Sequence, residues 1–174
     1  MAQESITFYK NPKIEILFGF YGGKPIPTKQ DKFKPIQAIA VDEEGNEIEV
    51  KNLYERKEDK NSIQEMKELV SENAKKAFEK KGIIKRPAEL EVVLSISLTE
   101  RRFKEVDVDN LAKTILDGLT GVAFDDDAQV SSLMVTKFVH QMKVDSILIG
   151  ITELTEANKG LRSDIKFMKD TKWE

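Results

Sequence analysis

Carboxylates and one lysine are crowded into a short stretch of the second half of the chain. Asp107 and Asp109 precede Lys113, and Asp126 and Asp127 follow after a short turn. Carboxylates this close repel one another unless a cation lies between them, so the spacing predicts a divalent-metal site. The lysine indicates a substrate that carries phosphate. The chain has no cysteine and one histidine, so oxygen atoms must hold the metal, which favours Mg²⁺, Mn²⁺ or Ca²⁺.

An amphipathic helix over residues 110–119 is expected to position these groups. Asp107 and Asp109 are two apart in a predicted extended entry, so their side chains point the same way. The turn over residues 121–124 is short enough to return Asp126 and Asp127 beside them. Three or four carboxylates and a lysine around one point would support metal-assisted phosphodiester hydrolysis. The predicted apolar side holds Leu111, Ala112, Ile115, Leu116 and Leu119, and the predicted polar side holds Asn110, Lys113, Thr114 and Asp117.

Each part of this arrangement also has a purely structural explanation. Asp109 could cap the helix, and Lys113 with Asp117, four residues on, could form a surface ion pair of small energy. Residues 125–127 could be an acidic turn. An EF-hand is excluded, because counting from Asp125 neither the glycine at the sixth position nor the glutamate at the twelfth is present. The combination of all the parts favours the metal site.

The remaining sequence predicts an α+β domain, with a small mixed or largely antiparallel sheet and about two main helices. Alternating apolar residues predict a strand over residues 89–98, with one buried face. Two hairpins are expected, one over residues 36–51 and one that joins strands over 130–138 and 144–151. A further strand is predicted over residues 14–21, a capped helix over 62–81, and charged loops over 28–34, 52–60 and 100–105.

Length and composition limit the class of protein. The chain has 174 residues, enough for one domain with a real core. We expect a single domain over residues 1–154 and a polar extension over 155–174, either a docked helix or a partly disordered end. No apolar run approaches the roughly 20 residues that span a bilayer, and no secretory signal is visible at the N-terminus. A cytoplasmic protein without a membrane partner is therefore expected.

The net charge of −3 gives no support to a nucleic-acid partner, but the local distribution of charge matters more than the sum. Two clusters of basic residues are predicted to contact phosphate and to make binding sensitive to salt. The second cluster directly precedes the acidic motif. The clusters are Lys24, Lys29, Lys32 and Lys34, and then Arg101, Arg102 and Lys104.

The acidic motif is similar to that of the RusA family of Holliday junction resolvases. The similarity is dense from Val106 to Lys137, and it is looser over residues 23–30, where a Gly/Pro/Lys loop follows the first predicted strand. The strand over residues 90–98 also falls where the family has one. The matching residues are Asp107, Asp109, Asn110, Leu111, Lys113, Asp117, Leu119, Asp126, Asp127, Ala128, Gln129, Val130 and Lys137.

This resemblance implies a homodimer that binds four-way DNA junctions and nicks two strands with Mg²⁺ or Mn²⁺, in DNA recombination and repair. It implies that Asp107, Asp109 and Asp127 bind metal, that Asp126 assists them, and that Lys113 acts in catalysis. It leaves Asp125 as a bystander to the metal site and Asp117 as a partner of Lys113 instead of a metal ligand. Lys137 is taken as a further DNA contact. A two-fold junction requires two sites related by the same symmetry, which is a physical reason for a dimer.

Two other functions are compatible with the sequence. The first is a RusA-like protein that binds branched DNA without cleaving it, which the acidic net charge and the apparent extra segments favour. The second is a globular protein whose acidic turn binds cations incidentally. Cleavage of a junction would separate the nuclease from the first, and a melting temperature that does not respond to divalent ions would support the second.

Overall fold

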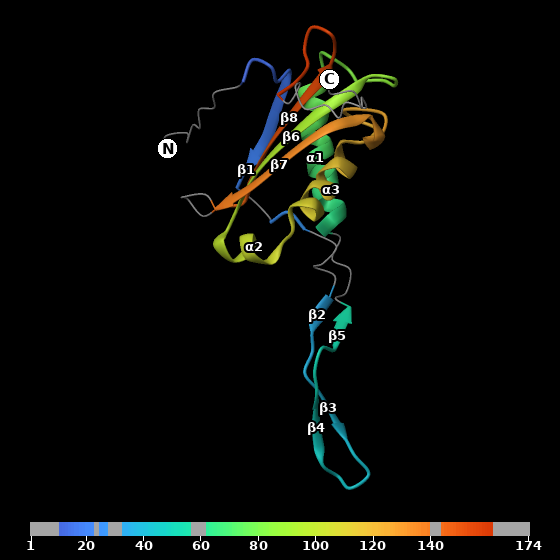
Figure 1. Cartoon of the computed structure of the whole chain (residues 1–174), viewed down its shortest axis with the longest axis vertical. Coiled ribbons are helices and arrows are strands. Elements are labelled where there is room, and N and C mark those ends of the chain that lie inside the picture. The colour runs from blue at the N-terminus through green and yellow to red at the C-terminus, as the bar shows by residue number, and fades with distance from the viewer. Residues whose placement is uncertain (1–10, 23–24, 28–32, 57–61, 140–143, 162–174) are drawn as a thin grey trace, which may run out of the picture.

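A four-stranded sheet forms the centre of the body (Figure 1). The computed structural model describes residues 11–22, 25–27, 33–56, 62–139 and 144–161, without the side chains of residues 33–35 and 56. The strands follow the order β1-β8-β6-β7. They are β1 (Ile16–Tyr21), β6 (Glu89–Leu98), β7 (Val130–Val139) and β8 (Ser146–Leu154).

β7 and β8 are not a hairpin, so that prediction is wrong. β6 lies between them, antiparallel to β8 and parallel to β7, with Leu90 opposite Val130 and Leu98 opposite Val139. A parallel pair requires a long crossover, and the segment between Leu98 and Val130 supplies it with two helices. β7 is therefore an end strand of the sheet, a position that sequence adjacency to β8 does not reveal.

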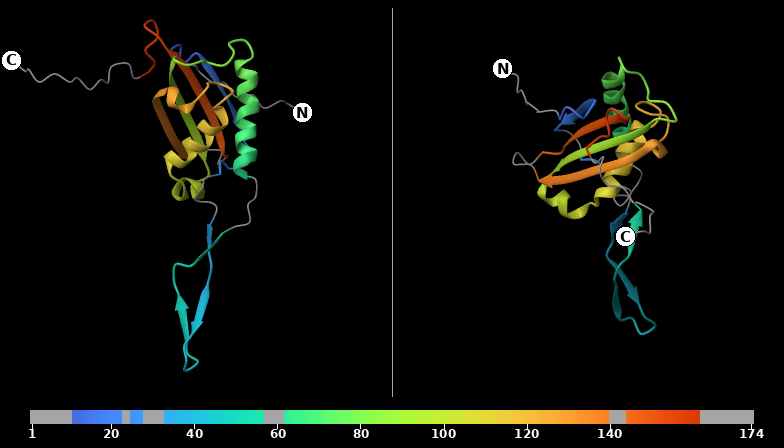
Figure 2. Two further views of the ribbon diagram at one scale, coloured as in Figure 1. Left: turned by 90° about the vertical axis from the view of Figure 1, so that its right-hand side faces the viewer. Right: turned by 45° about the horizontal axis from the view of Figure 1, so that its top comes forward.

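Two helices cover one face of the sheet, as Figure 2 shows. They are α1 (Ser62–Phe78) and α3 (Val108–Leu119). The predicted alternation of β6 is confirmed, because the alternate side chains of its predicted apolar face are fully buried in the core with these helices: Leu90, Val92, Leu94, Ile96 and Leu98. Burial of such side chains is worth about 1.5–3 kcal/mol each, so β6 and the helices form most of the core. The fold is α+β, as predicted.

α3 carries the predicted apolar side, with one addition. Leu111, Ile115 and Leu119 are fully buried, and Thr114, which we placed on the polar side, is also buried. The Thr114 hydroxyl donates to the carbonyl of Pro27 at 3.0 Å, so its polar group is satisfied inside the protein. Gly118 lets α1 approach closely, since a Cβ there would lie 3.0 Å from Cβ of Val70.

Residues 100–105, predicted as a charged loop, form the short helix α2 (Glu100–Glu105). Two ion pairs lie on this helix, each between side chains one turn apart. Arg101 pairs with Glu105 at 2.8 Å, and Lys104 pairs with Glu100 at 3.3 Å. Side chains at positions i and i+4 are neighbours on a helix. The pattern that we attributed to a charged loop is therefore the exposed surface of a helical turn.

A two-stranded arm extends away from the body (Figure 1). The predicted hairpin over residues 36–51 is confirmed as β3 (Ala38–Val41) and β4 (Glu47–Val50). Its base is a second ladder, β2 (Phe33–Pro35) with β5 (Tyr54–Arg56), in segments predicted to be loops. A side chain of Asp42 shapes the turn by accepting from the backbone of Glu44 and Asn46.

The end of the described chain lies against the sheet. Glu91 of β6 is buried, and its carboxylate accepts from the backbone of Leu161 at 2.7 Å and from the hydroxyl of Ser132 at 3.1 Å. The predicted extension over residues 155–174 therefore begins with a segment tied to the domain, and the rest of it lies outside the described residues. No helix in the described ranges is long and apolar enough to cross a membrane.

Candidate functional site

The N-terminal end of α3 presents the first pair of carboxylates. α3 begins at Val108, two residues earlier than predicted, so Asp107 is its N-cap residue and Asp109 lies in the first turn. Both side chains are exposed, as is that of Lys113. Asp109 and Lys113 are four apart on one face of the helix, and neither makes an ion pair within the described part of the chain. Both are therefore available to an external ligand.

Asp117 is not the partner of Lys113, so that expectation is wrong. Its carboxylate pairs with Lys67 of α1 at 2.8 Å, and both side chains are about one-third exposed. This pair joins α3 to α1 instead of lying along one helix. The charge of Lys113 is therefore not neutralised by Asp117, which fits a side chain that contacts phosphate.

The second group of carboxylates forms a rigid turn before β7. Asp126 caps the short 3₁₀ helix η2 (Asp127–Gln129), accepting from the backbone of Ala128 at 2.9 Å. The other carboxylate oxygen of Asp126 pairs with Arg86 at 2.9 Å. The hydrogen bond from Ala128 first, and then the charge of Arg86, lower the pKa of Asp126 below its usual value. Asp126 is thus already occupied by partners within the protein.

Asp125, which we expected to be a bystander to the metal site, holds a neighbouring loop. Its carboxylate pairs with Lys85 at 2.8 Å and accepts from the backbone of Arg86 at 3.1 Å. These two contacts, the Lys85 side chain foremost, lower the pKa of Asp125. Asp127 differs from both neighbours, because its side chain is exposed and carries no ion pair within the described residues.

The two groups of carboxylates lie at opposite ends of α3 in a single chain. α3 has 12 residues, a length of about 18 Å. Lys137, near the far end of β7, reaches the carbonyl of Val106 beside Asp107, whereas Asp127 precedes the start of that strand. The expectation that a short turn returns Asp126 and Asp127 beside Asp107 and Asp109 is therefore wrong for one chain.

This separation decides how the residues fit a metal ion. No group of three or more aspartate, glutamate, histidine or cysteine side chains could hold a metal within the described part of one chain. One chain alone therefore does not provide the complete set of ligands that the motif predicts. The turn between α3 and Asp127 is held by an isolated bridge between Phe124 and Ile84, which precede β7 and β6 respectively.

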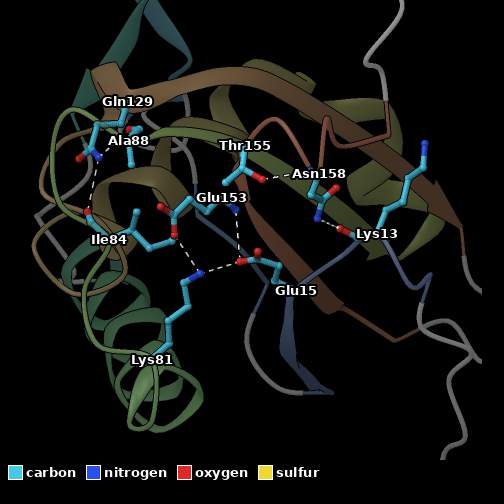
Figure 3. Close-up of polar contacts among 9 residues, drawn as sticks. All are labelled: Lys13, Glu15, Lys81, Ile84, Ala88, Gln129, Glu153, Thr155 and Asn158. Carbon is cyan, nitrogen blue, oxygen red and sulfur yellow. Dashed lines mark hydrogen bonds and ion pairs between the residues drawn. The ribbon is translucent and has the colours of Figure 1, made fainter.

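Gln129, which we named only as part of the family motif, has a structural role that we did not predict. Its buried amide donates to the carbonyls of Ile84 at 3.4 Å and Ala88 at 3.0 Å, as Figure 3 shows. Its amide oxygen accepts from the backbone of Asp126 at 3.1 Å, which completes a capping box. The spacing of an aspartate and a glutamine three residues later was the available signal.

Replacing Gln129 with alanine should destabilise the turn that presents Asp127. The change removes the side-chain partner of the Ala88 carbonyl and of the Asp126 backbone N–H, while the Ile84 carbonyl keeps its bond from the backbone of Asp125. Each buried group left unpaired costs about 1–3 kcal/mol. The expected result is a lower free energy of unfolding in urea. A Gln129→Ala variant as stable as the unsubstituted chain would show that water replaces the amide without loss.

The predicted DNA-binding residues fall into three groups. Lys24, Lys29 and Lys32 lie outside the described residues, and of Lys34 only the backbone is described. Arg101 and Lys104 are exposed on α2 and face solvent within their i,i+4 ion pairs. The Glu105 carboxylate raises the pKa of Arg101. These two side chains keep the accessibility that a phosphate contact requires.

Arg102 and Lys137 instead take part in the fold. The Arg102 guanidinium donates to the carbonyl of Ile26 at 2.7 Å, which fastens the buried segment before Pro27 to α2. The Lys137 ammonium donates to the carbonyls of Phe103 at 3.0 Å and Val106 at 2.6 Å, and lies over the Phe103 ring. The structure thus gives both residues contacts within the fold, Arg102 with the segment before Pro27 and Lys137 with the entry to α3. A DNA contact by either residue stays a prediction.

The fold and the site define an α+β protein whose acidic motif is divided between the two ends of one helix, α3. The sequence matches the family model described as endodeoxyribonuclease RusA over residues 23–150, which is most of the chain. The chain therefore belongs to the RusA endodeoxyribonuclease family. A search of curated proteins finds no match.

Proposed function

We propose that this chain is a Mg²⁺-dependent, structure-specific endodeoxyribonuclease that resolves four-way DNA junctions in recombination and repair. The observation that carries the proposal is the family match over residues 23–150, which includes both groups of carboxylates. Two features support it. Lys113 is exposed and makes no ion pair within the residues that the structure describes, and Asp109 and Asp127 are exposed carboxylates at the two ends of α3.

Asp107, Asp109 and Asp127 are the residues proposed to hold the metal, which would be Mg²⁺ or Mn²⁺. When bound, the ion would activate a water molecule and stabilise charge on the scissile phosphate. Asp126 is a weaker candidate for a ligand than the sequence suggested, because its two oxygen atoms are already held by Ala128 and Arg86. Lys113 would place its positive charge on the phosphate.

A homodimer would explain how carboxylates at opposite ends of one helix act together. β7 pairs only with β6 among the described strands, so its outer edge is open, and Leu133 and Val139 along it are 45% and 42% exposed. Open apolar edges tend to pair with another strand. In an antiparallel pair of β7 edges, the start of one strand lies beside the end of the other. Asp127 of one copy would then approach Asp107 of its partner.

The direct test is a labelled four-way junction incubated with the chain and Mg²⁺ or Mn²⁺, with linear duplex of the same sequence as the control. The expected result is symmetrical nicking of two strands of the junction and no cleavage of the duplex. Absence of cleavage under both metals would exclude the nuclease.

The second candidate is a protein that binds branched DNA without cleaving it. The separation of the carboxylates in a single chain favours it, since a protein that stays monomeric would lack a complete metal site. Binding of the junction by a monomer, without nicking, would support this function. Sedimentation of the chain with and without junction DNA distinguishes a monomer from a dimer.

A further inference from the structure

Lys85 and Arg86 lie beside the carboxylate turn, although the sequence motif does not include them. Both side chains are well exposed, at 66% and 59%. Lys85 pairs with Asp125 and Arg86 pairs with Asp126, so the two cations are held next to Asp127. They come from the loop between α1 and β6, far from Asp127 in the sequence.

The loop that carries these cations is rigidly fastened to the carboxylate turn. Ile84 exchanges backbone hydrogen bonds with Ala123 at 2.9 Å and with Asp125 at 3.3 Å. Gln129 holds the same loop on its other side through the carbonyls of Ile84 and Ala88 (Figure 3). The direction in which Lys85 and Arg86 project is therefore fixed together with that of Asp127.

Each cation has donors left over after its ion pair is made. The guanidinium of Arg86 has five N–H donors and the ammonium of Lys85 has three, and each group contacts one carboxylate in the described part of the chain. Ion pairs this exposed contribute little energy, so a phosphate oxygen competes for the same groups at small cost. Arginine in particular suits phosphate because its planar fork makes two parallel hydrogen bonds.

We propose that Lys85 and Arg86 form a binding site for the DNA phosphate backbone, beside the candidate catalytic residue Asp127. This proposal rests on the proposed function. Asp125 and Asp126 hold the two cations beside Asp127. A DNA strand bound at Asp127 would lie next to them, so the pair would set the position of the backbone at that carboxylate.

A second ion-pair cluster of the protein provides a matched control. Lys81 pairs with two carboxylates, Glu15 at 2.7 Å and Glu153 at 3.0 Å (Figure 3), and its side chain is 32% exposed. Glu15 precedes β1, the end strand opposite β7, and Glu153 lies in β8. Lys80 beside it is exposed. Changing Lys80 and Lys81 removes the same charge as changing Lys85 and Arg86, without touching the carboxylate turn.

The experiment measures the affinity for a labelled four-way junction without divalent ions, between roughly 50 and 200 mM salt. Each phosphate contact contributes about −0.9 to the slope of log affinity against log salt. The Lys85→Gln/Arg86→Gln variant should therefore bind more weakly at low salt. Across this range its loss of affinity should be smaller than that of the unsubstituted chain by about tenfold if one copy of the pair contacts the DNA, and by about a hundredfold if both copies of a homodimer do. Lys85→Arg/Arg86→Lys should retain both properties, and Lys80→Gln/Lys81→Gln should change neither.

Two results would overturn the proposal. One is unchanged affinity and slope for Lys85→Gln/Arg86→Gln while its melting temperature falls, which would make the pair a fastening between loops only. The other is an equal loss for Lys80→Gln/Lys81→Gln, which would make the effect one of total charge. If the unsubstituted chain itself failed to bind the junction, the proposed function would fall first, so the two failures are distinguishable.

Discussion

Chains that carry Asp107→Asn and chains that carry Asp127→Asn should each be inactive alone and should regain cleavage when they are mixed. Each substitution removes a proposed metal ligand, so each homodimer should cleave at least about a hundredfold more slowly. In a mixed dimer, one site combines both substitutions and the other combines both native aspartates. Because the two residues lie at opposite ends of α3, a shared site is what their separation requires.

The recovery has a predictable size and product. Random mixing should leave about a quarter of all sites intact, and at most one in each dimer. The product should be junctions nicked in one strand, because symmetrical cleavage needs two active sites. The measurement compares nicked and fully resolved junctions on a denaturing and a native gel.

A mixture of Asp107→Asn with Asp109→Asn is the matched control. Both residues lie at the N-terminal end of α3, so every site of the mixed dimer would lack one of them and no activity should return. Failure of Asp107→Asn and Asp127→Asn to recover activity together would contradict the shared site. Junction affinity of each variant, measured separately, shows that the loss of cleavage is not a loss of binding.

Two of the elements that periodicity predicted, β6 and α3, are buried on one side. β6 and α3 alternate apolar and polar residues with clear periods, because one face of each packs against the core. The structure confirms both, and the boundaries of β6 fall at Glu89 and Leu98 as expected. Such a pattern can be read from the local sequence, because the polarity of each residue reflects whether that residue is buried.

The errors share a different physical cause. The position of β6 between β7 and β8 depends on pairing between distant segments, which leaves no local pattern. Asp117 has a neighbour of opposite charge at Lys113, yet it pairs with Lys67 because α1 packs against α3. In each case a partner nearby in the sequence was available, and the observed contact is with a residue or strand that is distant in the sequence.

The same cause separates the two halves of the candidate site. A short turn between α3 and Asp126 suggested a return to Asp107, but the turn continues into the bridge between Ile84 and Phe124 instead. The motif in the sequence identifies residues worth testing. It says nothing about whether they meet within one chain or between two, because the spacing of residues along a helix is compatible with both.

Leu111→Ala should lower the free energy of unfolding of the chain without changing DNA cleavage by the molecules that remain folded. Leu111 is fully buried between α3 and the sheet, and a leucine truncated to alanine in a core costs about 2–5 kcal/mol, from lost burial and the cavity left behind. The free energy of unfolding in urea should fall by that amount. Leu69→Ala is the matched control, because Leu69 lies on α1 with 38% of its surface exposed and should cost much less.

This expectation is the reverse of the one for Asp107→Asn. Asp107 is exposed at the helix end, so its substitution should abolish cleavage and leave the unfolding transition nearly unchanged. Leu111→Ala should keep junction cleavage per folded molecule at low temperature, and lose it on warming as the folded fraction falls. If Leu111→Ala reduced cleavage at temperatures where the chain remains folded, the position of α3 would be set by more than its buried face, and the carboxylates at its two ends would depend on small shifts of the helix.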